Sequence, residues 1–409
     1  MSDHAAVTGS GVHAPARYGR AMREHWALDP DILYLNHGTV GATPRRVLEA
    51  QRRIRDEIER QPAQFLLREL SQVTVGRSPL PKPRLRMAAD AVAPFLGARG
   101  DDLVFVDNAT TGVNAILRSF DFHPGDEILI TDLVYGAIAH TARYVARRAG
   151  ATVRTIELPW PPDPSAVTAA IVEALGPRTR VLVVEHVTPE SALVLPVADI
   201  IARCRARGVP VLVDGAHAPG ALPVDLPALG ADWYVGNLHK WAWSPRSCGI
   251  LWAPPARQEG LHPVVISWGL DQGFTNEFDL VGTRDPSPHL AAPEGIAFLR
   301  ELGVESVQAW NHRLAWEGAH ALAARWGTRF EAPETMVGTM ATVPLPACAG
   351  AVRDDAIRLR DALLFEDGIE VQLHAWRGCL WTRISGQVYV EPADVERLGA
   401  AIEARIPRA

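Results

Sequence analysis

Short apolar runs alternate with amphipathic segments along most of the chain, and this alternation predicts strands and helices in turn. The apolar runs are nearly continuous in Val, Ile and Leu, which is typical of parallel strands buried on both faces. We expect strands at 102–106, 127–131, 180–186, 209–217, 233–236 and 248–253. The intervening segments repeat apolar residues at helical spacing. We expect helices at 110–120, 135–150, 163–175 and 197–208.

This alternation over residues 31–290 predicts a large α/β domain built on a mostly parallel sheet. The pattern changes after about residue 290, and residues 291–409 read as a smaller C-terminal α+β domain. Its expected elements are helices at 295–303, 355–368 and 392–406 and strands at 339–346, 369–376 and 380–390. Residues 1–30 are expected to form an N-terminal tail or arm.

Composition and charge exclude several classes of protein. The net charge is −6 and no block of basic residues is present, so neither nucleic acid nor an anionic membrane is an expected partner. No apolar run is long enough to span a bilayer, and the first residues lack the apolar core of a secretory signal. We therefore expect a cytoplasmic protein. Its four cysteines lack metal-ligand spacing, so neither a disulfide framework nor a metal site is expected.

Lysine is unusually rare in this chain. Of 41 basic residues only Lys82 and Lys240 are lysines, so most basic positions have become arginine. Arginine cannot lose its proton in a protein, whereas a buried lysine can, and then attack a carbonyl group. Lys82 lies in a polar, proline-containing segment and is expected to be an exposed loop residue. Lys240 follows a predicted buried strand and is the better candidate for chemistry.

Polar residues cluster where two predicted strands end. Asp214 ends one strand, with His217 three residues later, and Asn237, His239 and Lys240 follow the next strand. The 26 residues from Asp214 to Lys240 fit one strand–helix–strand step, and ligands of open α/β sheets bind beyond the carboxyl ends of strands. An isolated Asp at such a position is more often a turn or cap residue. The grouping instead favours a carboxylate and an amine that face one pocket.

The segment VDGAHAPG…DWYVGNLHKW resembles the core motif of the class V aminotransferase-like enzymes, which depend on pyridoxal 5′-phosphate (PLP) and have fold type I. The resemblance implies a large domain with a seven-stranded, mostly parallel sheet and a smaller C-terminal domain. It also implies that Lys240 holds PLP as a Schiff base and acts as the base at the substrate α-carbon. Asp214 would keep the pyridine nitrogen protonated, so that the ring is an electron sink. His217 would bind the phenolate oxygen of the ring.

Further segments extend the resemblance over nearly the whole chain. VFVDNATTGVNAIL resembles the phosphate-binding turn of the family, at a helix start whose N–H groups suit an anion. The residues expected at the phosphate are Asn108, Ala109, Thr110, Thr111, Asn237 and His239. Tyr135 occupies the position of a residue that stacks on the ring, although without the resemblance it reads equally well as a core tyrosine. His186 and Thr188 are weaker candidates on a strand under the cofactor.

The substrate end and the subunit interface are also implied by resemblance. FDLVGTRD is similar to the family segment that reaches the phosphate of a neighbouring subunit, so Thr283 implies a homodimer with shared sites. Arg383 occupies the position of the arginine that binds the substrate carboxylate, for which a planar guanidinium is suited. YLNHGTVGATP is most similar to isopenicillin N epimerase-like enzymes and places Asn36, His37 and Gly38 at the substrate end.

The reaction itself stays open between several outcomes. We expect chemistry at the α-carbon of an amino acid or amino-acid conjugate through a quinonoid, as an epimerase or a C–S (β-eliminating) lyase of secondary metabolism. The alternatives are an aminotransferase, a decarboxylating or deaminating enzyme of the same family, and a non-catalytic PLP-fold binding protein. A persulfide-forming cysteine desulfurase is disfavoured, because Cys379 is expected to begin a strand and not to lie on a mobile loop. A dinucleotide-dependent dehydrogenase is disfavoured because no G-x-G-x-x-G follows a strand.

Overall fold

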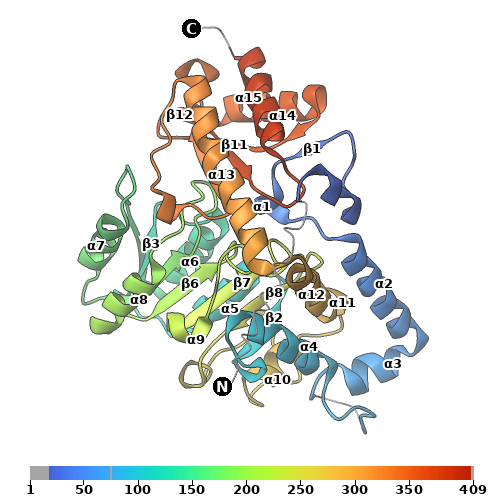
Figure 1. The fold of residues 1–409 in the computed structure, drawn as a ribbon. Coiled ribbons are helices and arrows are strands. Elements are labelled where there is room, and N and C mark those ends of the chain that lie inside the picture. Colours follow the sequence, from blue (N-terminus) through green and yellow to red (C-terminus); the bar gives the residue numbers. More distant parts are fainter. Residues whose placement is uncertain (1–17, 74–75, 407–409) are drawn as a thin grey trace, which may run out of the picture.

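A seven-stranded sheet forms the centre of the molecule in the computed structural model, which describes residues 18–73 and 76–406 (Figure 1). The strand order is β2-β8-β7-β6-β5-β3-β4, and all strands run parallel except β8. The strands are β2 Leu103–Val106, β3 Glu127–Thr131, β4 Thr152–Ile156, β5 Thr179–Glu185, β6 Val211–Gly215, β7 Trp233–Asn237 and β8 Gly249–Trp252. The expected seven-stranded, mostly parallel sheet is thus confirmed.

Both faces of this sheet are covered by helices, because alternate residues of each strand enter two different cores. Val104, Ile128 and Leu212 pack in one core with helices α5 (Ala109–Ser119) and α6 (Gly136–Ala149). Their neighbours along the strands pack in the second core. Helices there are α4 Arg84–Val92, α7 Pro164–Ala174, α8 Val197–Ala206 and α12 Ala292–Leu302. Burial on both faces explains the continuous apolar runs of the strands.

Two of the elements that were not expected show why the sequence pattern can fail to predict an element. Strand β4, at the edge of the sheet, carries mostly exposed residues and so shows no apolar run. Helix α13 (Val304–Trp326) is 23 residues long and was not expected. It packs against both β9 (Met340–Pro344) and α15 (Pro392–Arg405), and a helix covered on several sides has no single apolar stripe.

The C-terminal region forms a second, smaller unit above the sheet (Figure 1). Its antiparallel sheet has the order β11-β12-β9, where β11 is Gln372–Trp376 and β12 is Cys379–Ser385. Helix α14 (Arg353–Asp367) packs against β11. The two-residue turn between β11 and β12, Arg377 and Gly378, has positive φ at both positions, which is the geometry of a tight hairpin.

The N-terminal segment packs against this C-terminal unit. Of the expected tail at 1–30, residues 1–17 lie outside the described residues. From Tyr18 onward the chain is in contact with the fold, since the Tyr18 hydroxyl donates to Leu302 O and Arg20 pairs with Asp394 at 3.0 Å. Strand β1 (Leu33–Tyr34) then pairs in parallel with β10 (Ile369–Glu370). Helix α2 (Arg45–Arg60) follows.

The topology brings the carboxyl ends of neighbouring parallel strands to one edge of the sheet. Glu185 ends β5, Asp214 lies near the end of β6 as its register partner, and Asn237 ends β7. Strand β12 of the C-terminal unit carries Arg383 toward this edge. Within the described part of the chain, no helix has the combined length and hydropathy of a membrane span.

Candidate active site

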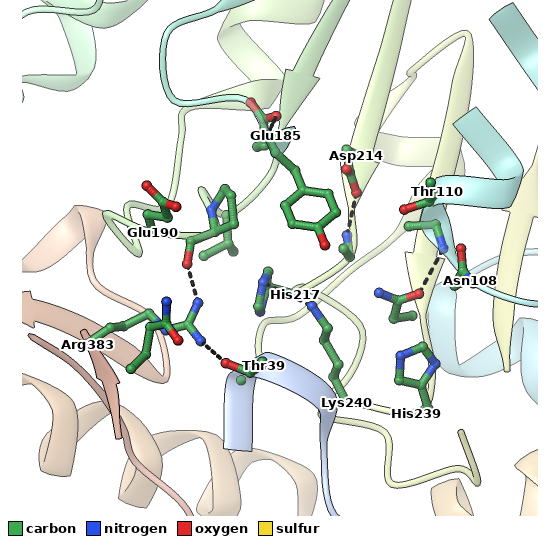
Figure 2. A pocket seen from close by; sticks show the side chains of 18 of the residues that line it. Thr39, Asn108, Thr110, Glu185, Glu190, Asp214, His217, His239, Lys240 and Arg383 are labelled. Carbon is green, nitrogen blue, oxygen red and sulfur yellow. Dashed lines mark hydrogen bonds between the residues drawn. The ribbon is translucent and has the colours of Figure 1, made fainter. Parts of the chain in front are cut away.

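A cavity of about 530 Å³ lies at this edge, between the large sheet and the C-terminal unit. Most of the residues that the sequence singled out line it. They are Gly38, Asn108, Ala109, Thr110, Thr111, Tyr135, Asp214, His217, Asn237, His239, Lys240 and Arg383. Figure 2 shows the labelled side chains converging on this space from separate parts of the chain.

Lys240 is the amine of the cavity and is almost fully buried. Its pKa is lowered from 10.5 to about 7, chiefly by burial and secondly by the positive charge of Arg383, while Asp214 opposes both effects. Its Nζ lies 3.1 Å from His217 Nε2 (Figure 2). A large fraction of a buried lysine with such a pKa is unprotonated at neutral pH, and the neutral amine can act as a nucleophile or base.

Asp214 and His217 approach the cavity from the end of β6. The Asp214 carboxylate is 3% exposed and accepts a hydrogen bond from the Ala216 N–H at 2.9 Å. Burial raises its pKa, and the Lys240 charge partly offsets this. His217 is neutral, because burial and the nearby cations hold its pKa well below 6.5. Its buried Nδ1 has no protein partner, so one polar atom remains for a ligand.

The start of helix α5 forms a possible anion site. Asn108 caps the helix by accepting the Thr111 N–H at 2.9 Å, and Asn237 Oδ1 accepts the Ala109 N–H at 2.8 Å. Among the described residues, the Thr110 N–H and hydroxyl have no hydrogen-bond partner and face the cavity. Helix N-termini favour phosphate for this reason. Asn237 therefore stabilises the turn before helix α5, in addition to its expected contact with phosphate.

Tyr135 and Glu185 lie together on another wall of the cavity. Tyr135 precedes helix α6 and is half exposed, so its ring borders the open space and is not part of the core. Its N–H donates to Glu185 Oε1 at 3.1 Å. Glu185 is 1% exposed and was not among the expected residues, since a carboxylate at the end of a buried strand gave no separate signal.

Arg383 forms the far end of the cavity with Thr39, Glu190 and Gln372. Its guanidinium donates to Thr39 Oγ1 at 2.7 Å and to Pro189 O, while its buried Nε has no partner. A donor left free on a buried guanidinium suits a carboxylate ligand. Thr39, Glu190 and Gln372 were not expected. Thr39 and Glu190 come from distant segments that only the tertiary structure brings to Arg383, and Gln372 is the register partner of Arg383 on β11.

Three expected residues do not line the cavity. His37 is fully buried behind Lys240, with Nε2 2.9 Å from Lys240 O and Nδ1 2.8 Å from the Tyr389 hydroxyl. Asn36 Oδ1 accepts from Arg383 Nη2 at 3.4 Å, and its Nδ2 donates to Glu370 Oε1 at 2.7 Å. Thr283 is exposed on the surface of the single chain. His37 and Asn36 thus support neighbouring site residues, in contrast to the expected lining role.

The structure also places His186 and Thr188, the weaker candidates on the strand, and Cys379. His186 points away into the interior, with Nδ1 3.0 Å from the Tyr234 hydroxyl, and Thr188 Oγ1 bonds within its own turn to Ser191. Cys379 begins β12, as expected, and its Sγ contacts Trp376 O. Among the described residues, no cysteine lines the cavity.

The fold and this cavity together define a class of protein. A buried amine with a lowered pKa, a buried carboxylate at the next strand end, a free helix start and a buried arginine are the groups that hold PLP and an amino acid in fold type I enzymes. The unpartnered Nδ1 of His217 and the free Thr110 N–H fit the phenolate and phosphate of that cofactor.

The comparison with protein families agrees with this class. The model of the family "Aminotransferase class-V" matches residues 81–398, and the chain belongs to this family of PLP-dependent enzymes. It is 33% identical to the isopenicillin N epimerase of Streptomyces clavuligerus, over 93% of this chain and 97% of that one. It is 34% identical to the putative L-cysteine desulfhydrase 1 of Oryza sativa subsp. japonica, over 94% of this chain and 84% of that one.

Solved structures confirm the fold. A cysteine desulfurase from Thermococcus onnurineus superposes with a TM-score of 0.77 at 20% identity, covering 96% of this chain and 99% of that one. A cystine C–S lyase bound to cysteine persulfide superposes with a TM-score of 0.73 at 22% identity, covering 93% and 99%. The expected family, fold and dependence on PLP are therefore confirmed.

Proposed function

We propose that this protein is a C–S lyase that removes a sulfur-bearing group from the β-carbon of an amino acid. The observation that carries the proposal is the set of residues that line the cavity. They include an amine that can lose its proton, Lys240, but no described cysteine that could accept sulfur. The two-residue turn before Cys379 leaves no mobile loop that could deliver one. Similarity to the L-cysteine desulfhydrase of rice supports the same reaction.

Each end of the cavity has a distinct task in this proposal. PLP, when bound, withdraws electrons from the α-carbon of the amino acid attached to it. Asp214 would face the ring nitrogen, His217 the phenolate oxygen, and Thr110 with Thr111 the phosphate. Arg383 would bind the substrate carboxylate through its free Nε–H, which directs the α-hydrogen toward Lys240.

The proposed elimination balances in protons and electrons with one base. Lys240 takes the α-hydrogen as a proton, and the Cβ–S bond breaks with its electron pair leaving on sulfur. The thiolate takes up a proton and departs as a free thiol. The remaining three-carbon unit is released as an enamine, which water converts into pyruvate and ammonium. No oxidant or reductant is consumed.

Epimerisation is the second candidate, and Tyr135 is the observation that favours it. Inversion of the configuration at the α-carbon needs a proton donor in addition to Lys240. The Tyr135 hydroxyl borders the cavity and makes no hydrogen bond among the described residues. Similarity to the epimerase of Streptomyces clavuligerus supports this reading equally.

One experiment separates the candidates. The holoenzyme is incubated in D₂O with L-cysteine, S-alkyl cysteines and amino acids that lack a β-leaving group. A lyase yields pyruvate, ammonium and thiol from the cysteine derivatives only. Deuterated D-amino acid, lost in Tyr135→Phe, would establish the epimerase instead, and a 2-oxo acid that keeps its side chain would indicate an aminotransferase. Turnover of none of these by PLP-loaded protein would refute both candidates.

We also propose that a second copy of the chain completes the site. Val264, Val265, Ile266 and Trp268 form an exposed apolar strip, in which Val265 is 55% and Trp268 is 82% exposed. The strip adjoins the phosphate end, since Val264 and Arg284 line one small hollow with Thr111. Exposed apolar strips of this kind mark protein interfaces. Light scattering should give a dimer, and Trp268→Glu should give monomers that bind PLP more weakly; monomeric wild-type protein would refute the proposal.

A further inference from the structure

Glu185 is a buried carboxylic acid that the proposed chemistry does not use. Its side chain lies at the end of β5 and is 1% exposed, yet it lines the cavity (Figure 2). Oε1 accepts the Tyr135 N–H at 3.1 Å, and Oε2 lies 3.3 Å from Thr131 Oγ1. One carboxyl group thus connects three segments: the end of β3, the end of β5 and the start of α6.

Glu185 also lies next to Asp214. The two are register partners on adjacent parallel strands, so their side chains leave the sheet on the same face. Two buried carboxylates at such positions repel each other when both are ionised, and one of them retains a proton. Burial and the Asp214 charge raise the pKa of Glu185 to about 8.

The surroundings decide which of the two carboxyls keeps the proton. Asp214 has Lys240 as a counter-charge and, with PLP bound, would face the ring nitrogen. The groups that face Glu185 are Thr131 from β3, the Tyr135 N–H from α6 and the Asp214 carboxylate from β6, and no cation is among them. Asp132, the residue that follows β3, accepts instead from the Leu158 N–H.

We propose that Glu185 is a positioning residue that works as a neutral acid: it fixes Tyr135 against the cofactor and leaves Asp214 as the single anion beside the ring. The carbonyl oxygen receives the Tyr135 N–H, and the hydroxyl group pairs with Thr131. This role rests on the proposed placement of the cofactor, but it holds for a lyase and an epimerase alike.

The test compares Glu185→Gln with Glu185→Ala in the holoenzyme. A glutamine amide has the shape and hydrogen-bonding pattern of the protonated acid, since its oxygen can accept from Tyr135 and its NH₂ can donate to Thr131. Glu185→Gln should retain PLP on dialysis within about twofold of wild type. Glu185→Ala removes the acceptor of the Tyr135 N–H and the link to Thr131, and we expect about tenfold weaker retention.

Infrared spectroscopy supplies a readout that a purely structural role would not change. Wild-type holoenzyme should show the carbonyl stretch of a protonated carboxylic acid at pH 7, fading as the pH rises through about 8. The band should be missing from Glu185→Gln. Absence of this band from wild type, or PLP loss from Glu185→Gln as severe as from Glu185→Ala, would overturn the proposal. If Glu185→Ala does not fold, wild type and Glu185→Gln decide.

The same experiment distinguishes two kinds of failure. Wild-type protein that binds no PLP would contradict the cofactor site and with it the proposed function. Wild-type protein that binds PLP but carries an ionised Glu185 at pH 7 contradicts only the role given to Glu185.

Discussion

Replacing Arg383 by glutamine removes a positive charge from the surroundings of Lys240, and the pKa of Lys240 should respond. In the native cavity this pKa falls from 10.5 to about 7, chiefly through burial and secondly through Arg383. At about 1.4 kcal/mol per unit, the whole shift corresponds to about 5 kcal/mol disfavouring the protonated amine. Burial remains in the variant, so we expect Arg383→Gln to raise the pKa by about one unit.

Asp214→Asn is the matched variant of opposite sign. The Asp214 carboxylate stabilises the protonated amine, so its removal should lower the pKa of Lys240 below about 7. Both variants exchange one charged group for a neutral one of similar size in the same cavity. A general loosening of the structure would move the pKa upward in both, whereas the electrostatic argument requires opposite directions.

The assay uses the scarcity of lysine. With only Lys82 and Lys240 in the chain, ¹⁵N-lysine labelling gives two side-chain amine signals, and each can be titrated by NMR in cofactor-free protein. Lys82, exposed and paired with Asp90, provides the reference signal. A Lys240 signal that titrates near 10.5, or a shift of the same sign in both variants, would refute the reasoning.

Three further results are expected. Because the native pKa of Lys240 lies below that of the unfolded chain, this residue binds more protons in the unfolded state between pH 7 and 10.5. Its contribution to the unfolding free energy of cofactor-free protein should therefore rise with pH there, and denaturant titrations should show it as the difference in slope between wild type and Lys240→Met. Lys240→Ala should lose the visible absorbance of bound PLP and all turnover, while Lys82→Arg, its surface control, should keep both. Glu190→Gln removes a carboxylate near Arg383 whose side chain makes no hydrogen bond or ion pair with the described residues. KM for substrates with anionic side chains should fall about two- to tenfold relative to KM for neutral substrates. If the ratio of these two KM values does not change, Glu190 does not select the substrate side chain.

The sequence pattern was sufficient for elements that are buried on both faces. Six strands of the large sheet are continuous apolar runs, and their expected positions agree with the structure within a few residues. It was insufficient for β4, which is an exposed edge strand, and for α13, whose neighbours surround it. In both cases the periodicity that predicts an element depends on what packs against it.

The same distinction between local sequence pattern and tertiary packing applies to the residues of the candidate active site. Asp214, His217 and Lys240 could be inferred because they are close in sequence and follow two adjacent strands. Glu185 could not, because its closeness to Asp214 comes from the pairing of β5 with β6. His37 was assigned to the right neighbourhood, but only the structure shows that it holds the backbone of Lys240 from behind.

By itself, the sequence determined the kind of chemistry, because an amine that can lose its proton and a carboxylate at the next strand end are chemical requirements visible in residue types and spacing. The tertiary structure decided which amine becomes neutral, which carboxylate keeps its proton and which arginine donor stays free. Those properties arise from burial and from charges on separate segments, such as Lys240 and Arg383, which are 143 residues apart in the sequence, and no local pattern encodes them.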